Sequence, residues 1–202
     1  MSKYDRESAY RTFSDFRAQV IAVICVAFSV IQLYHAVYAI TYMRALHLAI
    51  VLLLAFILYP AKRSMPKNTL PWYDIVLALL GFGVCMYQVV NQGALAARLR
   101  LKPHEIYLGV LGLVLLLEAT RRVVGLPIVV IAIVFIGVAI FGNYMPGFLR
   151  SNLSFRRIIE HLFYDYEGVF GPAIGACANF IFLFMLFGVD NQIYHDKRSP
   201  VF

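Results

Sequence analysis

The stretch AQVIAVICVAFSVIQLYHAVYAITYM, from Ala18 to Met43, runs for 26 residues with His35 as its only acidic or basic residue. About 20 apolar residues in a helix suffice to cross the hydrocarbon core of a bilayer. A cleaved secretory signal has a shorter apolar region that ends in small residues at a cleavage site. We therefore expect this stretch to remain in the chain as a transmembrane helix.

The composition of the whole chain also indicates that it lies in a lipid bilayer. Of 202 residues, 61% are hydrophobic and only 14% are charged, whereas about a quarter are charged in soluble domains. Mean hydropathy is +0.75. The net charge of +7 arises from Lys and Arg that flank apolar stretches and form no continuous basic face. Lipid headgroups are therefore the expected partners, and nucleic acid is not.

Five more apolar stretches follow the first, separated by clusters of charged residues and prolines. They are 45–61, 75–97, 104–120, 123–149 and 168–189. Only helices and closed barrels satisfy their backbone groups in lipid, and the period-two alternation of barrel strands is absent. The sequence thus predicts an all-α membrane protein of about six transmembrane helices. Within the fourth stretch the apolar run, Ile106 to Leu117, is short; if that stretch is re-entrant instead, every later orientation reverses.

Two regions are expected at the membrane surface. The segment 64–74 is interpreted as a loop in which Trp72 and Tyr73 act as interfacial anchors. Further on, apolar residues recur at helical spacing opposite Arg156, Arg157 and Glu160. These apolar residues are Phe155, Ile158, Ile159, Leu162 and Phe163. The pattern predicts an amphipathic helix lying flat in the interface, with Phe155, Arg156 and Arg157 as anchors.

The distribution of Lys and Arg predicts the orientation of the chain. Counted in alternating compartments, 11 lie on the side of the N-terminus and 7 on the other. Cytoplasmic loops are richer in these residues, so both termini are expected in the cytoplasm. The bias is small because the loops near Arg98 and Arg156 place positive charge on the outer side.

Glu118 is the only acid expected near a membrane segment, and Arg121 and Arg122 follow it on the same helical face. We interpret the three as a structural ion pair cluster, with a proton or ion relay as the alternative. His35 and His47 are expected at different depths and in structural roles. Neither they nor the three dispersed cysteines show metal-ligand spacing.

No catalytic motif, phosphate loop or zinc motif occurs in the chain. The sequence therefore predicts no enzyme activity and no cofactor. An intramembrane enzyme is kept as a rival hypothesis, and it requires Glu118, His35 and His47 to converge. A second rival is a self-contained membrane interaction or scaffold protein, whose glycine-rich helix faces pair and which transports nothing.

Several stretches together resemble one family of secondary transporters. They are RALHLAIVLLLAFILYP from Arg44, LPWYDIVLALLG from Leu70, LEATRRVVGLPIVVIAIVF from Leu117, FGNYMPG from Phe141 and YEGVFGPAIGACANFIFLFMLFG from Tyr166. Their order and spacing resemble the fused permease of the tripartite ATP-independent periplasmic (TRAP) transporters, of the TAXI type. The resemblance implies uptake of organic acids across the bacterial inner membrane, with a periplasmic solute-binding protein and a large transport subunit as partners.

The resemblance also implies a division of the chain. Residues 1–122 match the four-helix small subunit, a scaffold that braces the transport domain, and residues 123–189 match the opening helices of the large subunit. Residues 190–202 form a polar tail where the family continues with apolar helices. We therefore expect an N-terminal fragment that ends before the family's substrate and sodium sites, so no substrate-binding residue is assigned.

Overall fold

The computed structural model describes residues 10–13, 16–38, 42–62, 65–66, 68–97, 101–144, 147, 150 and 153–185. Within these ranges the chain is helical and has no strand, which confirms the all-α prediction. The α-helices are α1 (Phe16–Tyr38), α2 (Met43–Leu58), α3 (Trp72–Ala96), α4 (Pro103–Val123), α5 (Leu126–Ile140), α6 (Phe155–Ile159) and α7 (Pro172–Ala176). The predicted tail 190–202, Arg98 and Lys67 lie outside the described residues.

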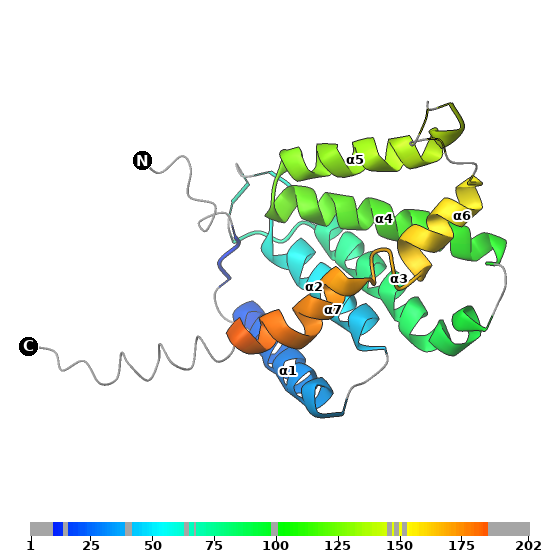
Figure 1. Cartoon of the computed structure of the whole chain (residues 1–202). Helices are drawn as coiled ribbons and strands as arrows, with labels where there is room; N and C mark the ends of the chain where they lie inside the picture. The colour runs from blue at the N-terminus through cyan, green and yellow to red at the C-terminus, as the bar shows by residue number, and fades with distance from the viewer. Residues whose placement is uncertain are drawn as a thin grey trace, which may run out of the picture.

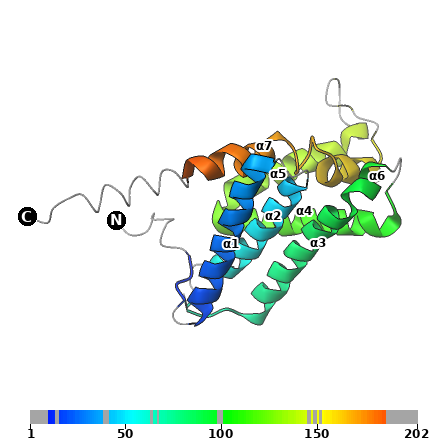
Figure 2. The ribbon, with the colours of Figure 1, turned by 90° about the horizontal axis from the view of Figure 1, so that it is seen from below.

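Three short segments with other helical geometries complete the described fold. The 3₁₀ turn η2 (Gly142–Tyr144) follows α5. The π-helical segments η4 (Glu160–Tyr164) and η5 (Cys177–Ile181) continue α6 and α7 without a break. Figure 1 shows α5 alongside α4, and α7 crossing α2 towards α1. In Figure 2, α1, α2 and α3 run side by side, with α6 and α7 along one edge.

Two described stretches are long and apolar enough to cross a membrane, Phe16–His35 and Trp72–Leu95. The sequence predicts six, and the other four differ for identifiable reasons. Met43–Leu58, Leu126–Ile140 and Pro172–Met185 are apolar but shorter. Helix α4 carries Glu105 in its first turn and Arg121 and Arg122 in its last.

Two predicted boundaries are wrong, because a glycine ends one helix inside a predicted span and a proline starts another helix inside a predicted loop. The predicted fifth stretch is divided near its start by Gly125, whose φ of 117° suits only glycine and ends α4. The predicted loop 64–74 ends too late, because Pro71 begins α3 and places Asp74 in its first turn. Trp72 is 75% exposed on this helix, and Tyr73 donates its hydroxyl to Met65 Sδ at 3.4 Å.

The core lies between α2, α3 and α4 and is closed by the segment after α5. Its buried side chains include Leu52, Phe56, Cys85, Leu115 and Ala119. The apolar face predicted for residues 155–163 packs on α4: Ile158, Ile159 and Phe163 are at most 3% exposed. Gly112 makes this approach possible, because a Cβ there would overlap the Phe163 ring. The face is thus covered by protein.

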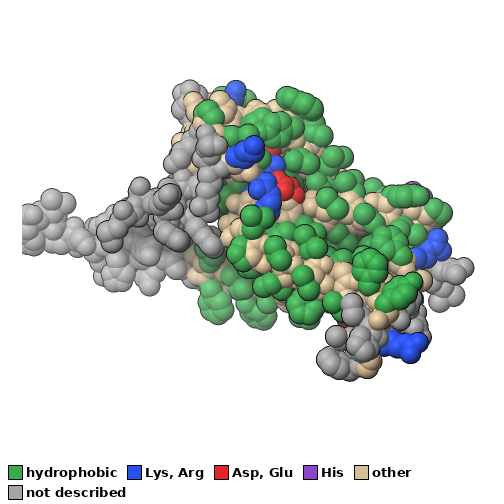
Figure 3. All heavy atoms as spheres, turned by 90° about the horizontal axis from the view of Figure 1, so that it is seen from above, with side chains coloured by type: hydrophobic (Ala, Val, Ile, Leu, Met, Phe, Trp, Pro, Cys, Tyr) green, Lys and Arg blue, Asp and Glu red, His purple; other side chains and the backbone are tan. Residues whose placement is uncertain are grey.

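The helices bring their polar groups to two opposite ends. Helix α3, with 25 residues, is roughly 37 Å long. We call the end that holds Asp74 and Arg122 the Arg122 end, and the end that holds Gln88 and Glu105 the Gln88 end. The described charged side chains visible in Figure 3 gather towards the ends of a largely hydrophobic surface.

Candidate functional site

At the Arg122 end, a buried carboxylate joins two arginines from distant parts of the chain. Asp74 has no exposed side-chain surface, and it accepts hydrogen bonds from Arg11 and from Arg122 Nη1, the latter at 2.7 Å. Arg11 is equally buried, and Arg122 is 2% exposed. Buried charges are tolerated only when paired and hydrogen-bonded, and each of these three has an ionic partner.

Arg11 also closes the C-terminal end of α2. Its Nη1 donates to the carbonyl oxygens of Phe56 and Ile57, at 3.3 and 3.0 Å, and its backbone N–H donates to Leu58 O at 2.7 Å. The last carbonyls of a helix lack partners within the helix. A residue that precedes α1 therefore fastens the end of α2 to the start of α3.

The predicted contacts of Glu118 are present. Its carboxylate accepts from Arg121 Nε and Nη2, at 2.7 and 2.8 Å, and from Arg122 Nε at 2.7 Å. Arg122 thus bridges Glu118 and Asp74, and its guanidinium lies 5.0 Å from the centre of the Phe56 ring. Glu118 is 28% exposed. Its structural role stays a prediction, as does the relay alternative.

The two histidines lie in a different cluster. His47 Nδ1 is 2.9 Å from Gln32 Nε2, which also donates to Ala178 O at 3.0 Å, and His35 Nε2 is 2.7 Å from Asn179 Oδ1. These contacts tie α1 and α2 to η5, whereas the contacts of Glu118 lie on α4. The geometry that the intramembrane enzyme hypothesis requires is therefore not formed.

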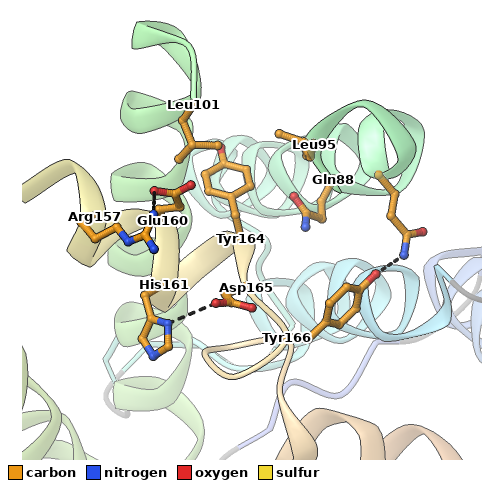
Figure 4. A pocket seen from close by; sticks show the side chains of 10 residues that line it. Gln88, Leu95, Leu101, Arg157, Glu160, His161, Tyr164, Asp165 and Tyr166 are labelled. Atoms are coloured by element: carbon orange, nitrogen blue, oxygen red, sulfur yellow. Dashed lines mark hydrogen bonds and ion pairs between the residues drawn. The ribbon is translucent and has the colours of Figure 1, made fainter. Parts of the chain in front are cut away.

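At the Gln88 end the structure contains a cavity of about 260 Å³. Helix α3 forms one wall, Leu101 just before α4 another, and α6 with η4 and the residues after it the third (Figure 4). The lining residues are Gln88, Gln92, Leu95, Leu101, Arg157, Glu160, His161, Tyr164, Asp165 and Tyr166. The predicted anchor Arg157 lies here, while Phe155 and Arg156, on the same helix, do not line the cavity.

The walls of the cavity are fixed by hydrogen bonds between elements. Tyr164 donates its hydroxyl to the carbonyl of Glu105 at 2.5 Å, and Gln92 Nε2 donates to the Tyr166 hydroxyl oxygen. Burial raises the pKa of Tyr164 above its ordinary value, and the nearby Glu105 carboxylate adds to this effect. Tyr164 therefore stays a neutral donor. The π-helical turn of η4 is a geometry that occurs often at functional sites.

One polar atom in this cavity has no partner. Gln88 is 7% exposed, and its Oε1 has no hydrogen bond to any residue that the structure describes. A buried acceptor left without a donor costs about 1–3 kcal/mol. The cavity therefore holds a hydrogen-bonding group that the folded chain itself leaves unused.

Charged side chains and a histidine line the cavity in two pairs. Arg157 Nη1 is 3.5 Å from Glu160 Oε2, and His161 Nδ1 is 3.2 Å from Asp165 Oδ2. One possible metal-ligand atom from each of three exposed residues, His161, Asp165 and Glu167, lies within 4.8 Å of the other two. Exposed carboxylates often gather without a metal, so this group alone does not define a metal site.

Sequence reasoning missed three residues that matter here. Glu118 is not the only acid at a membrane segment, because Asp74 and Glu105 are both fully buried. The Pro71 signal for a helix start could have placed Asp74 inside α3. Gln88 stands out as a strongly polar residue within an uncharged stretch, but nothing local shows that it lines a cavity.

Comparisons with family models, curated proteins and solved structures found no match to this chain.

Proposed function

We propose that this chain is a membrane-embedded component of a TRAP-type permease that takes up organic acids with a periplasmic solute-binding protein. In this proposal α1 to α4 form the scaffold domain of residues 1–122, and α5 to η5 belong to the opening helices of the transport domain. The proposal rests on the sequence resemblance together with the arrangement of polar and apolar groups.

The exposed apolar surface supports embedding in a bilayer. Val23, Val26 and Val30 on α1 are 60–67% exposed, and Ile131 and Phe135 on α5 are 56% and 70% exposed. Monomeric soluble proteins rarely expose apolar patches of more than a few hundred Å². In Figure 3 hydrophobic side chains are spread over the described part of the visible face, with few charged side chains among them. Lipid is the partner that fits this surface.

We further propose that the embedded chain crosses the bilayer six times, with its N-terminal side in the cytoplasm. Helices α2 and α5, with 16 and 15 residues, are roughly 24 and 22 Å long, so they would cross only with flanking residues, local thinning and snorkelling Lys or Arg. Support comes from the ends of the helices. The end of α2, the start of α3 and the end of α4 meet at the Arg122 end, as alternating spans require.

The observation that carries the scaffold role is the charge network at the Arg122 end. Through Arg11, Asp74 and Arg122 it links the segment before α1 to the ends of α2, α3 and α4. Buried ion pairs hold their partners in one arrangement, which suits a domain that braces a moving neighbour.

Reconstitution tests this proposal. Proteoliposomes would contain the 202-residue chain, a large TRAP transport subunit and a TAXI-type binding protein, each also omitted in turn. We expect sodium-dependent uptake of organic acids only when all three are present. Uptake with the chain and binding protein alone would make the chain a complete transporter. Uptake that is unchanged without the chain would leave the self-contained interaction protein as the better account.

A further inference from the structure

We propose that the cavity at the Gln88 end binds a zwitterion that carries a primary ammonium and a phosphate, the chemistry of an ethanolamine phosphate headgroup. The ammonium is held inside, against Gln88 and Glu160, and the phosphate lies at the mouth near Arg157. The ammonium chemistry is independent of the proposed transport function. Only a lipid source for the ligand rests on the proposed membrane embedding.

The unpartnered Gln88 oxygen determines what kind of atom enters the cavity. A carbonyl oxygen only accepts hydrogen bonds, so a ligand atom that reaches it must carry a hydrogen to donate. Gln88 is 7% exposed, and the wall beside it is apolar, formed by Leu95 and Leu101. A donor delivered by a ligand satisfies an acceptor that α3 has buried without a partner.

The charges of the lining favour a cation at the donor position. The lining contains two carboxylates, Glu160 and Asp165, one guanidinium, Arg157, and the imidazole of His161. Glu160 is 25% exposed, whereas Arg157 is 65% exposed and therefore stands further out. The Glu160 carboxylate thus lies deeper than the Arg157 guanidinium, while Asp165 and His161, 48% and 51% exposed, stand nearer the mouth. A molecule with an ammonium at one end and an anion at the other matches this order.

The size and position of the cavity fit a headgroup. Its volume of about 260 Å³ far exceeds the ~10–15 Å³ needed for a single water. Figure 4 shows Arg157 and His161 on one side of the cavity and Gln88 and Leu95, from the C-terminal part of α3, on the other. The exposed aromatic side chains of Tyr107 and Tyr166 lie at this end, as aromatic residues do at a membrane interface. A phosphatidylethanolamine headgroup would reach the cavity from that level.

A comparison of two headgroups tests the donor requirement. Phosphoethanolamine and phosphocholine carry the same charges, but the ammonium of the first has three N–H donors and that of the second has none. Calorimetric titration of the purified chain in detergent is expected to show phosphocholine binding at least about tenfold more weakly. Equal affinity for both would overturn the proposal.

Variants assign the binding to the cavity. Gln88→Leu is expected to weaken phosphoethanolamine binding at least about tenfold, and Gln19→Leu, the same change on the exposed face of α1, to leave it unchanged. If Gln88→Leu does not fold, Glu160→Gln serves instead, since removing one carboxylate should weaken binding of an ammonium. Affinity that is unchanged in the folded variant contradicts the assignment.

Native mass spectrometry distinguishes the two sources. The chain is extracted from vesicles that contain equal amounts of phosphatidylethanolamine and phosphatidylcholine. Retention of the ethanolamine lipid, reduced in the Gln88 variant, identifies a lipid ligand. Binding of soluble phosphoethanolamine without lipid retention identifies a free zwitterion, which also supports the proposal. The proposal is overturned if neither the lipid nor the soluble compound binds.

Discussion

The Arg122 end and the Gln88 end of this helical bundle differ in how the oxygens of one buried polar side chain, Asp74 or Gln88, are paired. At the Arg122 end, Asp74 is fully buried and both of its oxygens are paired with arginines. At the Gln88 end, a buried amide oxygen faces a cavity and has no partner within the described part of the chain. Arg11 Nε also lacks a partner, but the rest of that guanidinium is paired with Asp74 and the end of α2, whereas Gln88 belongs to the lining of a cavity. The contrast assigns structure to one end and binding to the other.

The largest expected effect is that of Asp74→Ala. This change leaves Arg11 and Arg122 buried without their shared carboxylate, and removal of one partner from a buried ion pair costs about 3–5 kcal/mol. Denaturant titration in detergent measures the free energy of unfolding. Asp165→Ala is the control, because Asp165 is 48% exposed, and a change of less than about 0.5 kcal/mol is expected there. Similar losses in the two variants would refute the distinction between the ends.

Gly112→Ala should have the next largest effect. A methyl group at this position overlaps the Phe163 ring, and overpacking of a core costs about 1–3 kcal/mol. Gly83 on α3 has open space around it, so Gly83→Ala is the matched control. There the gain in helix propensity should stabilise the chain by up to about 1 kcal/mol. We expect the melting temperature to fall in Gly112→Ala and to rise in Gly83→Ala. Equal shifts in the two variants would show that α6 and η4 do not pack on α4.

Gln88→Leu should change stability in the opposite direction to Asp74→Ala. Without ligand, the leucine removes a buried acceptor that has no donor, so the free energy of unfolding should rise by about 1 kcal/mol. Functional sites commonly sacrifice stability in this way. The measurement requires protein freed of co-purified lipid. A loss of 1 kcal/mol or more would show that Gln88 is structural.

Glu118→Gln should have the smallest effect. Glu118 is 28% exposed, and both of its arginines keep other acceptors, Ala61 O for Arg121 and Asp74 for Arg122. An ion pair of this kind contributes about 1 kcal/mol or less. Uptake in the three-component proteoliposomes should also persist. Abolished uptake with unchanged folding would replace the structural interpretation of Glu118 with a relay.

The difference between the ends also explains what could be predicted from the sequence. Patterns within one helix were sufficient for the all-α fold, for most of α1 and α3, and for the pairing of Glu118 with Arg121 and Arg122. The Asp74 site was missed because its partner Arg11 lies 63 residues away, and no local rule joins the two. Likewise, only the folded structure shows that Gln88 lines a cavity and that its side-chain oxygen has no partner, because the other lining residues are far from it in the sequence.

The lengths of the spans were harder to predict than the presence of helices. Counting uncharged residues merged the turn at Gly125 with the helix that follows it, and it did not show that α7 begins only at Pro172. Helices shorter than the uncharged stretches result, because a glycine with positive φ or a proline ends a helix without adding any charge.

The most direct test of the account asks whether the two ends lie on opposite sides of a membrane. Lys62, near the Arg122 end, and Lys102, at the Gln88 end, are both exposed. Single-cysteine variants Lys62→Cys and Lys102→Cys would be labelled in intact bacterial cells with a membrane-impermeant maleimide. The native cysteines Cys25, Cys85 and Cys177 are first replaced. We predict labelling of the Lys102→Cys variant from outside and of the Lys62→Cys variant only after permeabilisation. Labelling of both from the same side would contradict a bundle that spans the bilayer between these two ends.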